Sequence, residues 1–387
     1  MRLRYCCYCL LFFFSALSCK DRYVPDIQST GTGYLVVEGV LNAGNAPTTL
    51  TVSRTKKVAS GNQPAYESNA SITVEGTDNS AKQLTMTSAG IYQNNNLNLS
   101  ASNKYRVRIK TGDGKEYLSD FVAVKITPPI DSIGWKSNSD GVQLYVNTHD
   151  PANNTIYYRW DWDETWEIHS YYQSSLIYDP KSPLADAAGV RYRVFPQEDV
   201  NTCWRYGKST SLLFASSAKL TADVIHEFPI NEIPSGDDRL SVKYSILLRQ
   251  YAMDKAAYEF YDLMKKNTES IGSIFDPMPS ELRGNIHCVT NPSETVIGYI
   301  AAATVTQKRV FIASPPGWNL QQGCSLQFVI KNSDSTKAYF GAGAIVPINQ
   351  NKRTDPPPPA DGYDASTAIC VDCTARGGST QKPTYWP

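Results

Sequence analysis

The chain has 387 residues, of which 41% are hydrophobic, 11% are aromatic and 19% are charged. The charged fraction is too low for a disordered chain or a coiled coil, and the apolar residues are too scattered for a protein with several membrane spans. Basic and acidic residues both number 37, so net charge provides no general attraction to nucleic acid or to an acidic membrane surface. We therefore expect a globular body of two or three domains, with no nucleic-acid partner.

Residues 1–18 have the pattern of an export signal. Arg2 and Arg4 precede an apolar run, and Ser18 and Cys19 follow it. The run is shorter than the roughly 20 residues that a membrane-spanning helix needs. The sequence therefore predicts a signal peptide over residues 1–18, a lipid on Cys19 and a lipidated tether over residues 19–32. Secretion without a lipid is the alternative, and the residues leave the membrane leaflet undecided.

Short strand-like segments alternate with turns from residue 33 to residue 126. They cover residues 35–39, 48–53, 70–75, 105–109 and 116–124. About 90 residues with strands at this spacing fit an immunoglobulin-like β-sandwich. Pro128 and Pro129 then interrupt the pattern and mark the predicted start of a larger β-rich domain over residues 127–387.

Two elements of the larger domain have clear patterns. A strand over residues 157–168 is predicted because tryptophans and charged residues alternate there, with Glu164 as the exception. A helix is predicted over residues 254–267, where apolar residues recur at helical spacing and Asp254 suits the N-cap. The expected fold class is therefore mainly β: an immunoglobulin-like sandwich, then a β-rich domain with one clear α-helix and a cysteine-containing tail.

An ordered set of short motifs resembles one known family. The motifs include residues 23–25, 35–39, 130–135, 158–160, 164–167, 273–277, 308–312 and 370–373. Together they resemble the domain-of-unknown-function 4249 family of Bacteroidota outer-membrane lipoproteins. The resemblance implies an outer-membrane location through a lipid anchor and a TonB-dependent receptor as partner. It provides no catalytic residue.

The predicted strand over residues 157–168 also carries the candidate ligand or partner surface: Trp160, Trp162, Glu164, Trp166 and Glu167. Core packing of the tryptophans and structural or solvent-facing carboxylates are the favoured interpretation. Tryptophans on a half-exposed sheet can instead stack on sugars, and paired carboxylates can hydrolyse glycosides. On a strand, Glu164 and Glu167 point to opposite faces, which argues against such a pair.

Five cysteines besides Cys19 remain after the predicted cleavage: Cys203, Cys288, Cys324, Cys370 and Cys373. Outside the cytoplasm they favour disulfides, with one cysteine left over, and their pairing stays open. Cys370 and Cys373 have the spacing of a redox pair, but their Gly- and Pro-rich surroundings differ from the strand-to-helix turn of such motifs. No second cysteine pair or histidine pair at ligand spacing accompanies them, so we expect no metal and no cofactor.

The sequence contains no motif of a serine hydrolase, a zinc protease or a phosphate-binding loop. We therefore expect a non-catalytic outer-membrane lipoprotein that acts as an accessory or ligand-binding partner of a TonB-dependent transporter in nutrient uptake. A structural or adhesive envelope protein that binds a glycan or matrix is the alternative. An extracellular hydrolase is the third possibility.

Overall fold

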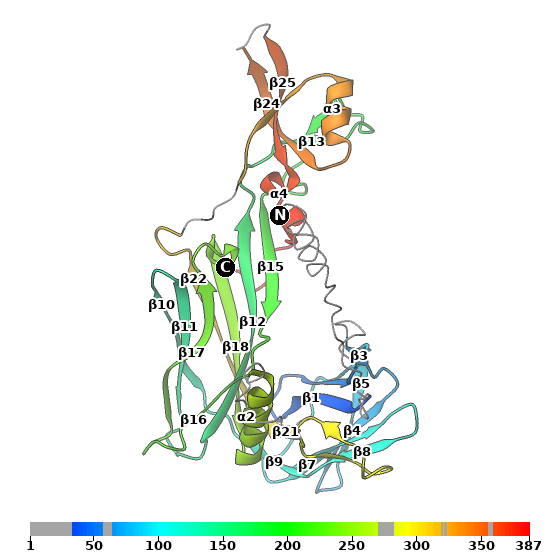
Figure 1. The fold of residues 1–387 in the computed structure, drawn as a ribbon, viewed down its shortest axis with the longest axis vertical. Helices are drawn as coiled ribbons and strands as arrows, with labels where there is room; N and C mark the ends of the chain where they lie inside the picture. Colours follow the sequence, from blue (N-terminus) through cyan, green and yellow to red (C-terminus); the bar gives the residue numbers. More distant parts are fainter. Residues whose placement is uncertain (1–32, 57–63, 270–281, 319, 321–322, 355–358) are drawn as a thin grey trace, which may run out of the picture.

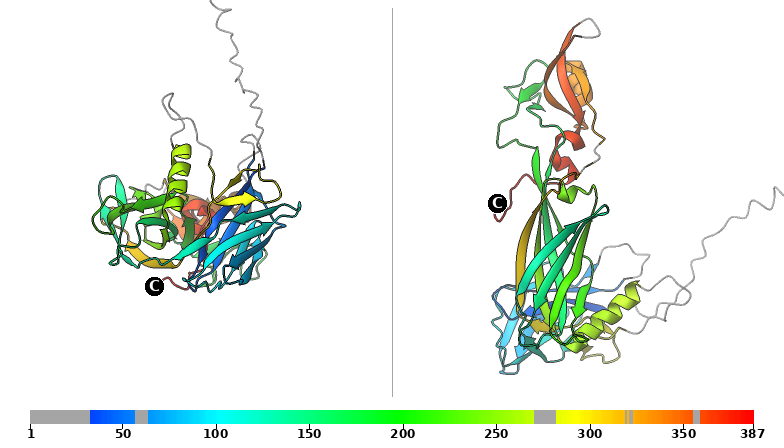
Figure 2. Two further views of the ribbon diagram at one scale, coloured as in Figure 1. Left: turned by 90° about the horizontal axis from the view of Figure 1, so that it is seen from below. Right: turned by 90° about the vertical axis from the view of Figure 1, so that its left-hand side faces the viewer.

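A computed structural model describes residues 33–56, 64–269, 282–318, 320, 323–354 and 359–387. The predicted signal peptide, Cys19 and the tether lie outside these residues. The described chain is mainly β, as predicted, and its strands form three regions in a row (Figures 1 and 2). We call them the closed sheet, the sandwich and the tip, and the closed sheet and the tip lie at opposite ends.

The closed sheet combines the N-terminal strands with three short strands from much later in the chain. Its strands are β1 (Leu35–Asn42), β2 (Thr48–Arg54), β3 (Ala65–Tyr66), β4 (Ser71–Gly76), β5 (Ala81–Ser88), β6 (Ile91–Asn94), β7 (Lys104–Lys110), β8 (Glu116–Ser119), β9 (Val122–Lys125), β19 (Ile286–Cys288), β20 (Val296–Ile297) and β21 (Ala301–Ala303). The pairing runs from β7 through β4, β5, β6, β2, β1 and β21 to β9, and β9 pairs with β7 again. The circuit of strands therefore closes on itself.

The immunoglobulin-like sandwich predicted for residues 33–126 is not confirmed. Alternating strands such as β7, where Tyr105, Val107 and Ile109 are buried, surround one aliphatic core. Pairing around this core is continuous, and β21 lies between β1 and β9. Three consecutive alanines have no alternation that assigns them to a sheet, so sequence pattern alone does not reveal that residues 301–303 complete this one.

The sandwich packs two antiparallel sheets face to face. One sheet contains β10 (Ile130–Ser137), β11 (Gly141–His149) and β17 (Val224–Pro234), and the 3₁₀ helix η2 (Asp238–Leu240) follows it. The other sheet contains β12 (Tyr157–His169), β15 (Thr202–Lys208), β16 (Leu213–Ser216), β18 (Lys243–Met253) and β22 (Val305–Ala313). β12 confirms the predicted alternation, because its tryptophans face the core between the two sheets.

The predicted helix is present as α2 (Lys255–Glu269). Asp254 caps its first turn, since its Oδ1 accepts a hydrogen bond from the backbone N–H of Ala257 at 2.7 Å. Ala257, Phe260 and Tyr261 are buried on one face of the helix. This face lies at the end of the sandwich that adjoins the closed sheet (Figure 1).

The tip is built from two distant stretches of chain. β13 (Leu176–Tyr178) and β14 (Val190–Tyr192) lie between β12 and β15 in sequence. The second stretch contains β23 (Gln327–Ile330), α3 (Ser333–Phe340), β24 (Ile345–Arg353), β25 (Ala360–Thr367), α4 (Ala368–Val371) and the 3₁₀ helix η3 (Cys373–Arg376). The predicted cysteine-containing tail therefore belongs to a folded region that has a three-stranded sheet and the two helices α3 and α4. The polar sequence of α3 has little helical periodicity, and the helix is fixed by its Asn332 cap and by burial of Phe340.

Two segments at which the chain passes between the closed sheet and the sandwich lie side by side. They are residues 126–129, between β9 and β10, and residue 304, between β21 and β22. The backbone N–H of Thr127 donates to Thr304 Oγ1 at 2.8 Å, and the hydroxyl of Thr127 accepts from Ala252 N at 2.9 Å. Gln250, which is fully buried, donates through its side chain to the carbonyl oxygen of Pro128 at 2.9 Å. These bonds connect Thr127 and Pro128 to β18 and connect Thr127 to the second segment, at the junction of the two regions.

Candidate functional site

The tryptophans of the predicted surface are core residues. Trp160, Trp162 and Trp166 are 1%, 5% and 7% exposed, respectively. The indole N–H of Trp160 donates to Gln250 Oε1 at 2.8 Å, so even its polar edge is used inside the sandwich. Their burial corrects the candidate surface and agrees with the core interpretation, because the second sheet covers the face of β12 that carries them.

The two glutamates of the candidate surface lie on opposite sides of β12. Glu164 faces the interior, where its Oε2 accepts from the hydroxyl of Tyr244 at 2.8 Å and lies 3.5 Å from Nη1 of Arg239. Burial and the Glu164 carboxylate raise the pKa of the Tyr244 hydroxyl above its usual value. Glu167 faces outward and is bound by His169 at 2.8 Å and by the indole of Trp386 at 2.9 Å. These positions do not bring the two carboxylates to one substrate.

The C-terminal tail covers part of the outer face of β12. Tyr385 shares a hydrogen bond of 2.8 Å with Thr165, and the guanidinium of Arg309 lies 3.8 Å from the centre of the Tyr385 ring. Trp386 is 5% exposed and packs edge-on against Trp204. The outward side of the candidate surface is therefore occupied by the end of the same chain.

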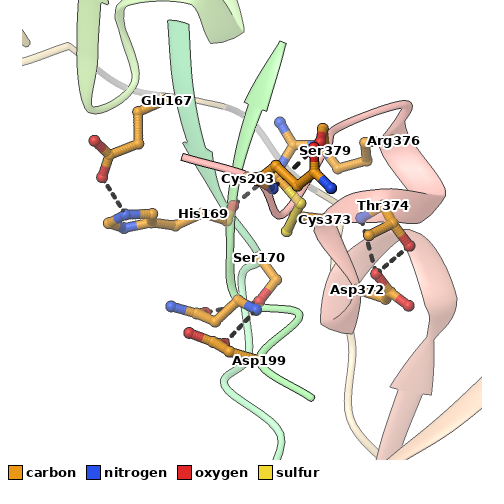
Figure 3. Close-up of a disulfide and its surroundings, with 12 residues drawn as sticks. Glu167, His169, Ser170, Asp199, Cys203, Asp372, Cys373, Thr374, Arg376 and Ser379 are labelled. Carbon is orange, nitrogen blue, oxygen red and sulfur yellow. Dashed lines mark hydrogen bonds and ion pairs between the residues drawn. A yellow bond between two sulfur atoms is a disulfide. The ribbon is translucent and has the colours of Figure 1, made fainter. Parts of the chain in front are cut away.

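Four of the five predicted disulfide cysteines are paired. Cys203 bonds to Cys373 and Cys324 bonds to Cys370, while Cys288 is buried with a free thiol. Figure 3 shows the first disulfide between β15 and η3, with Arg376 beside it. Because Cys370 and Cys373 bond to different distant partners, their spacing serves two structural crosslinks and not one redox pair.

A cavity of about 330 Å³ lies between the closed sheet and the sandwich. One wall consists of residues 36–39 of β1, the last residue of β20 and the two residues that follow it, 298 and 299. The opposite wall consists of residues 159–161 of β12, residues 209–212 and the buried face of α2. The size and the position between two regions are typical of small-molecule sites, which range from roughly 300 to 1,000 Å³.

Arg159 is the cation of this cavity. Its side chain is 19% exposed and lies between the rings of Tyr251 and Tyr261, at 5.3 and 5.1 Å from their centres. Among the described residues its hydrogen bonding is limited to the Tyr261 hydroxyl, at 3.1 Å, and Asp161 lies 3.6 Å away. Burial opposes its charge, but the nearby Tyr261 and Asp161 outweigh burial and raise the pKa of the guanidinium. Most of its five N–H donors are therefore available to a ligand.

Asp161 is already neutralised from its other side. Arg249 donates through Nε to Asp161 Oδ1 at 2.5 Å and through Nη1 to Asp163 Oδ2 at 2.6 Å. Burial alone would raise the pKa of the Asp163 carboxyl, but the Arg249 guanidinium holds that pKa below its usual range. Arg159 is left with no carboxylate of its own within hydrogen-bond distance.

Glu38 is the anion on the opposite wall. In β1, Leu35 and Val37 point into the closed-sheet core, so Val36 and Glu38 point outward toward the sandwich. Glu38 is exposed and has no hydrogen bond or ion pair with any described residue. Apolar side chains complete the lining between the two charges: Leu212, Phe260, Met264 and Tyr299.

Backbone geometry at Gly298 gives the cavity its closed-sheet wall. β1 pairs with β20 up to Val36 and with β21 from Val40 onward in the same register, and the pairing is interrupted in between. Gly298 has a φ of +141°, and a Cβ there would lie 2.2 Å from the carbonyl oxygen of Val37. This close approach of the two backbones therefore requires glycine. Behind it, Tyr299 donates to Asp254 at 3.2 Å, and burial and that carboxylate raise the pKa of the Tyr299 hydroxyl.

The chain matches a protein-family model. The model described as a domain of unknown function (DUF4249) matches residues 20–309. The chain belongs to this family. The match contains every residue that lines the cavity and ends within β22, before the second half of the tip. No curated protein matches the chain.

Among the described residues, no helix is long and apolar enough to cross a membrane. In the same part of the chain, no group of three or more metal-binding side chains is arranged to hold an ion. Sequence reasoning missed Arg159 and Glu38, although the strand alternation does place Arg159 on the face of β12 opposite the tryptophans.

Proposed function

We propose that this family member is a non-catalytic lipoprotein of the outer membrane that acts as an accessory, ligand-binding partner of a TonB-dependent transporter. The observation that carries the proposal is the cavity where the closed sheet meets the sandwich. It is lined by opposite charges and aromatic rings, and the hydrogen bonds of Thr127 and Gln250 hold its walls together before any ligand binds. Such preorganisation favours binding, because little order has to be created.

The disulfides support a location outside the cytoplasm. Both crosslink distant parts of the chain, since Cys203 and Cys373 are 170 positions apart and Cys324 and Cys370 are 46 positions apart. Structural disulfides of this kind persist in oxidising compartments and are rare in the cytosol. This agrees with the export signal expected from residues 1–18 and with an anchor at Cys19.

The anchor and the cavity are close in the chain. Gly33, the first described residue, lies 14 positions after Cys19 and two positions before β1. Fourteen residues reach at most roughly 50 Å when fully extended, so a lipid on Cys19 keeps the start of the described chain within about that distance of the membrane. Confinement to the membrane surface raises the effective concentration of a captured ligand beside a transporter.

Immunoprecipitation at native expression tests this function. We expect the mature protein in the outer-membrane fraction, together with an outer-membrane barrel after mild solubilisation. A Cys19→Ser variant is the matched control and should leave the membrane fraction. Repeated recovery without any outer-membrane barrel, or an unanchored wild-type protein, would contradict the proposal.

An adhesive envelope protein is the second candidate, and the tip favours it. Leu184, Tyr192 and Ile369 are 73%, 63% and 58% exposed at this end of the molecule. Exposed apolar side chains of this kind offer contacts to a partner. A deletion strain separates the two functions. A growth defect on one nutrient favours uptake, whereas altered attachment with normal growth favours adhesion.

A further inference from the structure

The cavity between the closed sheet and the sandwich is lined by charged side chains of both signs: Glu38, Arg159 and Asp161. Arg249 satisfies Asp161, so the remaining charges are the guanidinium of Arg159 and the carboxylate of Glu38. A simple anion would meet Arg159 but would also meet the carboxylates of Glu38 and Asp161. A simple cation would be attracted by these carboxylates but repelled by the guanidinium of Arg159. The ligand that satisfies both walls carries one positive and one negative group.

The rest of the lining is partly apolar, while residues 209–211 contribute hydroxyl groups. Leu212, Phe260 and Met264, with the rings of Tyr261 and Tyr299, form the apolar part. A ligand with a large apolar or aromatic body buries surface there. The volume of about 330 Å³ suits one such molecule and is too small for a long oligosaccharide or peptide.

We propose that this cavity binds a small zwitterion with a large apolar side chain, such as a free aromatic or aliphatic amino acid. Its carboxylate binds the guanidinium of Arg159, its ammonium binds the carboxylate of Glu38, and its side chain packs on Phe260 and Met264. The inference rests on the proposed ligand-binding role and names the chemical class of the ligand. Arginine suits the carboxylate end because its planar donors match the two oxygens.

Three probes with the same aromatic body test the assignment by isothermal titration calorimetry on the full mature chain in detergent. L-phenylalanine carries both charges, 3-phenylpropionate lacks the ammonium, and 2-phenylethylamine lacks the carboxylate. We expect phenylalanine to bind tightest. Loss of either charged group should weaken binding roughly tenfold or more, as expected for a charge-assisted hydrogen bond.

Two variants assign each end of the ligand. In Glu38→Gln, phenylalanine and 3-phenylpropionate should bind equally, because the ammonium has lost its partner. In Arg159→Gln, phenylalanine and 2-phenylethylamine should bind equally. Glu38 is exposed, so its variant should fold even if Arg159→Gln does not. Lys82→Gln, which removes a charge on the exposed side of β5, is the control and should bind all three probes like the wild type.

Three results would overturn the assignment. The first is that none of the probes binds at millimolar concentration, and the second is that 3-phenylpropionate binds the wild type as tightly as phenylalanine does. The third is phenylalanine binding that neither variant changes, which places it elsewhere on the protein. Recovery of an outer-membrane barrel with Glu38→Gln separates this outcome from the proposed function, because the accessory role does not depend on the ligand being an amino acid.

Discussion

The closed sheet and the tip lie at opposite ends of the molecule and are stabilised by different interactions (Figure 2). The closed sheet surrounds a large aliphatic core in which Leu35, Leu50 and Ile72 are fully buried. Its described cysteine, Cys288, has a free thiol. Apolar burial is sufficient there, because closure of the strand circuit leaves few unpaired edges around the core.

The tip has much less to bury. Its core consists of a few residues around Phe340 and Tyr363, and they come from two distant stretches of chain. A disulfide lies within the tip and a second one joins it to β15. Asp186 adds a polar connection, since it accepts from the Tyr363 hydroxyl at 2.6 Å and pairs with Lys331 at 3.0 Å. Small regions with small cores depend on such crosslinks.

The largest expected effect is loss of the disulfide that joins the tip to the sandwich. The Cys203→Ser, Cys373→Ser double variant should lose about 2–5 kcal/mol of stability, because a long loop regains its freedom in the unfolded chain. Hydrogen exchange should accelerate in β25 and stay slow in β1. Cys288→Ala, which removes a thiol without breaking a crosslink, is the control. Equal loss of protection in β1 and β25 would contradict the claim that the tip depends on this disulfide more than the closed sheet does.

The closed sheet should be most sensitive to backbone changes. In Gly298→Ala the new Cβ lies 2.2 Å from the carbonyl oxygen of Val37, at a φ of +141° that alanine rarely adopts. We expect a loss of about 2–4 kcal/mol, measured by urea denaturation. Gly343→Ala is the matched control in the tip, since its Cβ would meet nothing within 4 Å at a φ of +71°. It should cost about 1–2 kcal/mol, and a larger loss than for Gly298→Ala would refute the argument.

The hydrogen bonds of two buried tyrosines allow a direct comparison of polar stabilisation in the tip and in the closed sheet. Tyr363 donates to a carboxylate in the tip, whereas Tyr105 accepts from the backbone N–H of Ser100 at 2.8 Å in the closed sheet. Tyr363→Phe should cost about 1.5–3 kcal/mol and Tyr105→Phe about 0.5–1.5 kcal/mol, because hydrogen bonds to charged groups are stronger. Thermal denaturation of the two variants measures the difference. Equal costs would show that the tip depends less on polar contacts than we infer.

Local patterns predicted the parts of the fold that depend on neighbours in sequence. The alternation in β12, its exception at Glu164 and the cap of α2 by Asp254 are all present. Each depends on residues within one element, where the side-chain period alone determines the face. The number of disulfide cysteines also followed from arithmetic, with Cys288 left over.

The remaining features depend on contacts between residues far apart in the chain. The closed sheet needs residues 301–303 next to β1, and the tip needs the segment before β13 next to β24, where Ser175 donates to the carbonyl oxygen of Ile348. The cavity needs Glu38, Arg159 and Phe260 in one place, although more than 100 positions separate each from the next. No local periodicity of the sequence specifies these long-range contacts. Burial of Trp160, Trp162 and Trp166 likewise depends on the second sheet, which covers them.

The smallest expected effect is an acid sensitivity of the tip. Arg191 binds Glu198 through two hydrogen bonds of 2.8 and 2.7 Å, and these bonds, with the backbone N–H of Val194, lower the pKa of the Glu198 carboxyl to about 2. A folded-state pKa below the unfolded value of 4.5 gives stability that is present above pH 4.5 and is lost as the pH falls toward 2. Because both side chains are partly exposed, we expect the ion pair to contribute about 1 kcal/mol or less to stability.

Glu198→Gln should flatten this acid limb when the unfolding of the tip is followed between pH 5 and pH 2. Glu67→Gln, which removes the partner of Arg54 in the closed sheet, is the control and should leave the acid limb of the tip unchanged. An identical acid limb in Glu198→Gln and in the wild type would show that this ion pair does not stabilise the tip.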